Sequence, residues 1–187
     1  MSQARPLVRT SSTNERSPTA AGDLDVVFVG GGFSATMTLV HLIRELSGAA
    51  PLRIAMLDRD GEFGGGVPYG SLADPMFLLN ENVATMNVSG LLDWLSVHRE
   101  RWLGLLEAKH SPGVMNWLAI NARALRAARA NPASYLPLHI PRCIFGLFVC
   151  EVLQATIADA RKASVASVDL VRGDAITICS VDPPKPL

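Results

Sequence analysis

One segment near the N-terminus constrains the fold of this chain more than any other. Four consecutive apolar residues lie within Asp25–Gly30, Gly31 and Gly32 then turn the chain, and a stretch with helical periodicity follows. The apolar run is mostly β-branched, which predicts a strand buried on both faces. From about Ser34 to Leu46, apolar side chains recur on one stripe, which predicts an amphipathic helix.

A second apolar run, Leu52–Asp58, completes a strand–helix–strand unit. The strands of such a unit are parallel and are joined by a right-handed crossover. A strand buried on both faces needs a neighbour on each side. We expect Leu52–Asp58 to be one neighbour of the first strand. In the 3-2-1-4 strand order, the other neighbour would come from a segment that this sequence does not contain. The sequence therefore predicts an α/β fold with a parallel sheet.

The turn of this unit has the composition of a dinucleotide-binding loop. It reads Gly30-Gly31-Gly32-Phe33-Ser34-Ala35, which fits G-x-G-x-x-[G/A] between a strand and a helix. In such a loop Gly30 allows the tight turn, Gly32 lets a pyrophosphate approach the backbone, and Ala35 lets the helix pack closely. The helix N-terminus offers N–H groups and a positive dipole end to the phosphates. Asp58 ends the second strand, 23 positions after Ala35, where a ribose-binding acid is expected.

Asp58 and its neighbour Arg59 favour different nucleotides, one with a free ribose 2′-hydroxyl and the other with a 2′-phosphate. A carboxylate at position 58 would repel a 2′-phosphate and favours a free hydroxyl, whereas Arg59, which we include in the site, would attract one. A further alternative is a strand–helix–strand unit that binds no nucleotide, with Asp58 as a solvated strand end.

The remainder of the sequence predicts helices, a loop, two more strands and a polar tail. The tail, 1–22, has the composition of a disordered segment, with a transit-type peptide as the alternative. The predicted elements are a glycine-rich loop at 61–70, irregular chain at 74–88, helices at about 90–107, 115–130 and 142–163, and strands at 165–172 and 175–181. A short extended piece is expected between Pro137 and Pro141. Trp94, Trp102 and Trp117 lie at helical spacing and are expected in the core. In the helix predicted at about 90–107, the side chains expected on one buried stripe are Leu91, Leu95, His98, Trp102 and Leu105. His98 is therefore expected to be a core histidine.

Composition excludes several classes of function. Seventeen basic residues balance seventeen acidic ones, so a nucleic-acid partner is disfavoured. No uncharged apolar stretch is long enough to predict a membrane span. Three cysteines without a CxxC pair predict reduced thiols and a cytoplasmic protein, and the scattered histidines predict no metal site. A nucleophile elbow and a P-loop are also absent from the sequence.

Three further segments carry a resemblance to a known family. Gly61–Gly70 contains G-G-G-V-P-Y-G, the segment 74–80 ends in F-L-L-N, and Ile140–Phe148 reads I-P-R-C-I-F-G-L-F. Together with G-G-G-F-S-A and the acid at 58, this order resembles the bacterial FAD-NAD(P)-binding family of two-dinucleotide flavoproteins, which are related to glutathione-reductase-like folds. The resemblance runs from about Asp25 to Ile178. The sequence departs from the family pattern at Ala35, where glycine is usual, at Asp58, where Glu is commoner, and at Thr85, where a cation is usual.

The resemblance implies a Rossmann-like FAD-binding domain with a helical insertion at about 89–163 and the start of a β-meander. It implies FAD as the cofactor and NAD(P)H as a possible electron donor. The residues that would contact FAD are Gly30, Gly31, Gly32, Phe33, Ser34, Ala35, Asp58, Arg59, Gly65, Gly66, Val67, Tyr69, Asn80, Arg142 and Ala175. Two of these residues have an alternative, purely structural role. Tyr69 could serve only to pack the loop, and Arg142 could simply begin a helix and pair with Glu151 or another carboxylate.

The family continues beyond the segments found in this sequence. We therefore expect residues 23–187 to be the N-terminal portion of a flavin-dependent oxidoreductase, completed by further segments or by a partner chain that covers the open sheet edge, with oligomerisation as another way to cover it. No catalytic residue can be assigned. The alternatives are a nucleotide-binding remnant or interaction module without turnover, and a small NAD-dependent enzyme on a single Rossmann unit.

Overall fold

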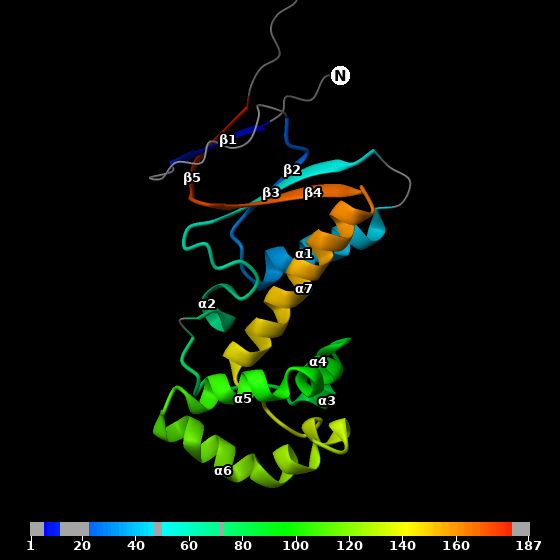
Figure 1. The fold of residues 1–187 in the computed structure, drawn as a ribbon. Coiled ribbons are helices and arrows are strands. Elements are labelled where there is room, and N and C mark those ends of the chain that lie inside the picture. The colour runs from blue at the N-terminus through cyan, green and yellow to red at the C-terminus, as the bar shows by residue number, and fades with distance from the viewer. Residues whose placement is uncertain (1–5, 12–22, 47–49, 72, 181–187) are drawn as a thin grey trace, which may run out of the picture. The chain divides into compact units, whose positions relative to one another are not determined.

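The computed structural model describes residues 6–11, 23–46, 50–71 and 73–180, and Figure 1 shows their elements. They divide into two compact units. Unit 1 is formed by residues Met1–Gly66 and Val152–Leu187, and unit 2 by Val67–Glu151. The boundary near the C-terminal end falls within the long helix α7 (Arg142–Lys162).

Unit 1 is an α/β unit built on a parallel sheet. Its elements are β1 (Pro6–Ser11), β2 (Val26–Val29), α1 (Phe33–Glu45), β3 (Leu52–Asp58), the C-terminal part of α7, β4 (Ala166–Arg172) and β5 (Asp174–Ser180). Strands β2, β3 and β4 form a three-stranded sheet in that order, and both pairings are parallel. The predicted fold class is therefore confirmed.

The core of unit 1 lies between this sheet and two helices. Figure 1 shows α1 and the C-terminal part of α7 on the same side of the sheet. The buried residues that pack together there are Leu39 and Ile43 of α1, Ile54 and Met56 of β3, Leu153, Ile157 and Ala160 of α7, and Ala166 and Val168 of β4. Ala35 packs against this cluster, which is the packing role expected of a small residue at that position.

Strand β2 is less buried than its sequence predicts. Val29 is 57% exposed and the residues Val26, Val27 and Phe28 are half-buried. The reason is that β2 lies at the edge of the sheet and, within the described residues, pairs only with β3. The expectation that β2 is buried on both faces is therefore wrong for the described residues.

A two-stranded antiparallel sheet accompanies the parallel one. The sequence predicts strand β5, but its partner β1 lies within the segment for which the sequence predicts a disordered tail. Ala175 of β5 faces Thr10 of β1 in the backbone register. Pro6–Ser11 thus forms a strand within that segment, and the rest of 1–22 lies outside the described residues.

Unit 2 is helical. Its elements are α3 (Val83–Met86), α4 (Leu91–Val97), α5 (Arg99–Glu107), α6 (Pro112–Ala127), η1 (Pro132–Tyr135) and the N-terminal part of α7. The short helix α2 (Gly66–Tyr69) begins at Gly66 of unit 1, and its other residues belong to unit 2. Trp94, Trp102 and Trp117 are all buried, as the sequence predicts. Two extended segments also run side by side: Leu78 bridges Pro141, and the backbone N–H of Leu79 donates to the carbonyl of Ile140 (2.9 Å).

The helix predicted over 90–107 is two helices. The break falls at His98, whose backbone (φ −96°, ψ 16°) is not helical. As a consequence the predicted stripe is not buried throughout: Leu91, Leu95 and Trp102 are buried, but Leu105 is 44% exposed. Short-range turns account for the other differences, because α2 lies within the predicted loop, α3 within the predicted irregular chain, and η1 precedes the expected extended piece.

Helix α7 is long and apolar enough to cross a membrane by length and composition alone. It is the one helix in the described part of the chain that meets this criterion. Its buried residues pack in the cores of the two units, among them Phe145 and Leu153. Glu151, near its middle, bonds to polar side chains of unit 2.

Candidate functional site

The glycine turn after β2 adopts a conformation that requires glycine. Gly30 has φ +97°, in the region that disfavours side chains, and its N–H donates to the carbonyl of Leu57 in β3 (2.7 Å). A Cβ atom at Gly30 would meet no atom within 4 Å. Gly32 is the N-cap of α1 and offers no side-chain acceptor to the first-turn N–H groups. The turn therefore presents open backbone and a helix N-terminus that its N-cap residue leaves uncapped.

Asp58 is bonded to this turn by its carboxylate. Oδ2 accepts the N–H of Gly31 (3.0 Å), and Oδ1 accepts the N–H groups of Asp60 (3.0 Å) and Glu62 (3.2 Å). Each carboxylate oxygen has two lone pairs, and Oδ2 accepts the N–H of Gly31 with one of them, so Oδ2 is the atom suited to accept from a ribose hydroxyl. Burial raises the pKa of Asp58, but the backbone N–H groups outweigh it and hold the pKa below its ordinary value.

The second glycine cluster packs directly on the first. The N–H of Gly64 donates to the carbonyl of Gly31 (2.8 Å), and a Cβ atom at Gly66, which has φ +55°, would lie 2.8 Å from Cα of Gly32. At Gly31 a Cβ atom would lie 2.7 Å from the Phe63 ring. Close approach therefore explains the glycines at 31 and 66, which serve packing within the loop. Gly65 is buried beside them.

The other predicted site residues of unit 1 lie at the start of α1, just after β3 and in β5. Phe33 and Ser34 form the first turn of α1, and Ser34 is exposed. Arg59 forms an ion pair with Asp174, the first residue of β5, with 3.3 Å between Nε and Oδ1. Asp174 carries no sequence signal of a site, because only the pairing of strands brings it beside residue 59. Ala175 follows it in β5 and is half-buried.

Unit 2 contains the remaining predicted residues. Arg142 begins α7, and its guanidinium donates to the carbonyl of Leu78 (3.1 Å) and to Oδ1 of Asn80 (3.2 Å). The structure thus brings Arg142 and Asn80 together. The alternative pairing of Arg142 with Glu151 is wrong, because Glu151 is engaged elsewhere.

Tyr69 and Val67 differ sharply in their surroundings. The ring of Tyr69 packs edge-on against Phe145 (5.4 Å between centroids), and a Cβ atom at Gly146 would lie only 1.8 Å from the carbonyl oxygen of Tyr69. Gly146 is therefore required for α7 to approach this segment. Val67 is 83% exposed.

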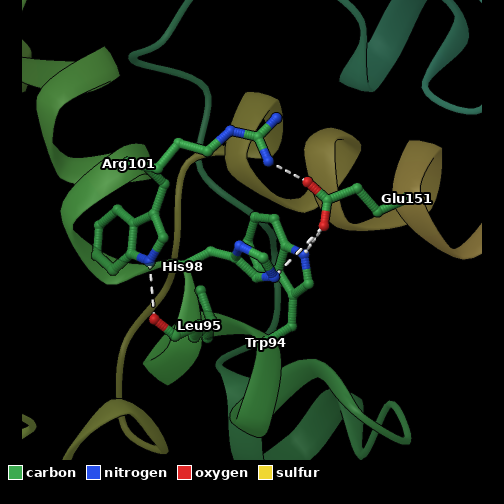
Figure 2. A network of polar contacts seen from close by, with 6 residues as sticks. Trp94, Leu95, His98, Arg101 and Glu151 are labelled. Carbon is green, nitrogen blue, oxygen red and sulfur yellow. Dashed lines mark hydrogen bonds and ion pairs between the residues drawn. The ribbon is translucent and has the colours of Figure 1, made fainter.

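Figure 2 shows a polar network in unit 2 that the sequence did not predict. Glu151 of α7 accepts the indole N–H of Trp94 (2.6 Å), lies 3.5 Å from Nε2 of His98, and is paired with Arg101. Burial raises the pKa of Glu151, but the hydrogen bonds from Trp94 and Arg101 and the nearby positive charges outweigh it and lower the pKa. His98 therefore lies beside a carboxylate and is half-buried. The signal in the sequence was a lone Glu in the middle of an apolar helix.

Within the described residues, no group of three or more His, Cys, Asp or Glu side chains lies close enough to hold a metal ion.

A parallel sheet, a glycine turn leading into a helix, and an acid bonded to that turn at the end of the next strand together define a dinucleotide-binding α/β domain. The family model described as FAD-NAD(P)-binding matches residues 27–183. The chain belongs to this family.

The chain is similar to one part of longer mycobacterial proteins. The uncharacterized proteins Mb3437c of Mycobacterium bovis and Rv3403c of Mycobacterium tuberculosis are each 29% identical over 166 residues, which cover 84% of this chain and 30% of the relative. The chain thus spans less than a third of the length of these relatives. No solved structure matches it significantly.

Proposed function

We propose that this chain binds FAD on its first βαβ unit and forms the N-terminal cofactor-binding portion of an FAD/NAD(P)-dependent oxidoreductase. The observation that carries the proposal is the bonded turn. Gly30 and Gly32 present open backbone at the N-terminus of α1, and Asp58 lies within hydrogen-bond distance of Gly31 between them. This arrangement fits a pyrophosphate on the turn and a ribose at the acid.

The residues present fit the adenosine diphosphate half of FAD. The open space over Gly30 and the helix N-terminus after Gly32 suit the two phosphates, because the N-cap residue has no side chain to occupy the first-turn N–H groups. Asp58 would accept from the ribose, and β5, near Ala175, would lie along the adenine. When bound, the isoalloxazine supplies the redox chemistry, and this chain would bind and orient it.

FAD is preferred to a nicotinamide nucleotide because of the second glycine cluster. Gly64 and Gly66 pack on the dinucleotide turn, and at Gly66 a larger residue would collide with it. A simple NAD-binding unit has no need of that cluster. In the family resemblance it continues through Val67 and Tyr69 toward the flavin, with Asn80 and Arg142 further along.

Three further parts of the proposal concern the whole protein. NAD(P)H is the proposed electron donor, a second copy or another segment is the proposed cover for the edge of β2, and the cytoplasm is the proposed location. The last is supported by Cys143, Cys150 and Cys179, none of which forms a disulfide.

Purification of the chain tests the proposal. The protein is denatured, and any released flavin is identified as FAD or FMN by chromatography; a colourless preparation is titrated with FAD, NAD⁺ and NADH by calorimetry. Bound or rebinding FAD supports the proposal. A folded chain that binds NADH but no FAD would favour the single-Rossmann enzyme, and one that binds none of them would favour a non-catalytic remnant or interaction module.

A further inference from the structure

An ion pair beside Asp58 bears on which adenosine nucleotides unit 1 accepts. Arg59 directly follows the proposed ribose acid, and its Nε lies 3.3 Å from Oδ1 of Asp174. Neither the glycine motif nor the family resemblance gave Asp174 a role. Both side chains are well exposed, 76% for Arg59 and 54% for Asp174, so they are accessible to a ligand.

The backbone fixes this pairing. Asp58 faces Arg172 in the parallel register of β3 and β4, and the N–H of Gly173 donates to the carbonyl of Asp58 (2.9 Å). The residue after Gly173 therefore emerges beside the residue after Asp58. Asp174 begins β5 at this point, so the end of one sheet and the start of the other set its position.

The two charges have opposite consequences for a nucleotide. In dinucleotide folds an acid at this strand end binds the 2′-hydroxyl, and a nearby Arg accommodates a 2′-phosphate. Arg59 could take that second role if its guanidinium were unpaired. Asp174 neutralises Arg59 and adds a carboxylate of its own, and both effects disfavour a 2′-phosphate.

We propose that Asp174 is a positioning residue that, by engaging the guanidinium of Arg59, makes unit 1 select adenosine nucleotides with a free 2′-hydroxyl. The inference rests on the proposed binding of an ADP-containing dinucleotide at the turn, and it names the class accepted: FAD and NAD⁺ rather than 2′-phosphorylated nucleotides.

Arg172 provides the matched control. It lies at the end of β4, one residue from the turn, and its side chain runs along Gly61, where a Cβ atom would be 3.4 Å from Cδ. Among the described residues it forms no ion pair with Asp174. Removing the charge of Arg172 changes the net charge by the same amount as removing that of Arg59, but leaves the Arg59–Asp174 pair intact.

The test measures binding of ADP-ribose and 2′-phospho-ADP-ribose to the full chain by calorimetry at low ionic strength. These probes share the ADP half of FAD and differ only in the 2′-phosphate. In Asp174→Asn the Kd ratio of the phosphorylated to the unphosphorylated probe should fall about three- to fivefold, the effect expected of one exposed ion pair. Asp174→Glu should restore the original ratio. Compared with Arg59→Gln alone, the double variant of Asp174→Asn and Arg59→Gln should show a smaller change, because only the direct repulsion by the Asp174 carboxylate is then lost. The full change should persist when Asp174→Asn is combined with Arg172→Gln, and it should shrink at high salt.

Each other outcome overturns the inference. An unchanged ratio in Asp174→Asn, with ADP-ribose still bound, would show that Asp174 does not control selection. A shift that is undiminished without Arg59 would show that Asp174 acts only through its own charge. If no variant, nor the unaltered chain, binds ADP-ribose or FAD, the proposed function itself fails and the inference with it. Circular dichroism of each variant separates these results from loss of folding.

Discussion

At the scale of single residues, adjacent glycines of the turn after β2 have different physical tasks. Gly31 is closed in by Phe63 and Asp58, whereas a Cβ atom at Gly32 would meet only Cα of Gly66, at an ordinary van der Waals distance of 3.8 Å. A small side chain at Gly31 must displace its neighbours. At Gly32 a small side chain fits within the protein, but it occupies the space through which a pyrophosphate would approach the backbone.

Two alanine variants separate these tasks. Gly31→Ala should lower the free energy of unfolding by about 1–3 kcal/mol, the usual cost of overpacking. Gly32→Ala should change the stability little, but weaken FAD binding by about tenfold, or roughly 1.4 kcal/mol. Urea unfolding and calorimetric titration measure the two effects. Equal losses of stability in both variants would contradict this division.

Asp58 should stabilise unit 1 through its charge. Asp58→Asn retains the shape, but places an amide NH₂ group among backbone donors. We expect a loss of about 1–3 kcal/mol at neutral pH, measured by urea unfolding. Asp60→Asn, an exposed neighbour whose carboxylate is outside the bonded set, is the control and should have little effect.

The same residue predicts a pH dependence with a definite sign. The pKa of Asp58 is lowered in the folded chain, so its contribution is fully present above the unfolded-state pKa and is lost as pH falls through the folded-state pKa. Between neutral and acidic pH the parent chain should therefore lose more stability than Asp58→Asn. Equal slopes of unfolding free energy against pH would rule out this contribution.

At the scale of elements, local pattern predicted regular structure well and failed where distant residues decide. β3 has the predicted bounds, Leu52–Asp58, and α1 differs from its prediction by about one residue at each end, because both follow from hydrophobic periodicity in a short window. The break at His98 coincides with the contacts of Trp94, His98 and Arg101 with Glu151, fifty or more positions away. β1 pairs with a strand at the other end of the chain, and no local window contains that partner.

The Glu151 network should stabilise the packing of α7 against α4 and α5. Glu151→Gln keeps the size of the side chain but removes the charge that faces Arg101 and His98. We expect the free energy of unfolding of unit 2 to fall by about 1–2 kcal/mol. Hydrogen exchange should become faster in α4 and in the N-terminal part of α7. Glu107→Gln, an exposed position on α5, is the charge-matched control. Identical exchange in the two variants would mean that the network contributes nothing measurable.

At the scale of the whole molecule, fold class and family were predictable because a strand, a turn, a helix, a second strand and an acid agree in order and spacing. The structure then brought together site residues that had been predicted singly: Gly31 with Asp58, Gly32 with Gly66, and Asn80 with Arg142. It also added Asp174 and the Glu151 network, which depend on tertiary pairing. The role of each predicted residue toward the cofactor stays a prediction.

Ligand binding should stabilise unit 1 by mass action. With FAD at a hundred times its Kd, the stabilisation should be about 2.7 kcal/mol. Hydrogen exchange should locate this gain in β2, α1 and β3, which hold the turn. Slower exchange confined to α6, with no change at the turn, would place the ligand elsewhere.

The burial of the tryptophans in unit 2 has an optical consequence. All three Trp and both Tyr residues of the sequence lie between residues 67 and 151, and unit 1 has none. Ultraviolet emission of this protein is therefore a reporter of unit 2 alone. A flavin held at the glycine turn would absorb in the range where tryptophan emits. The chain would thus carry its own donor and acceptor, and resonance energy transfer could measure the separation of the two units without an added dye.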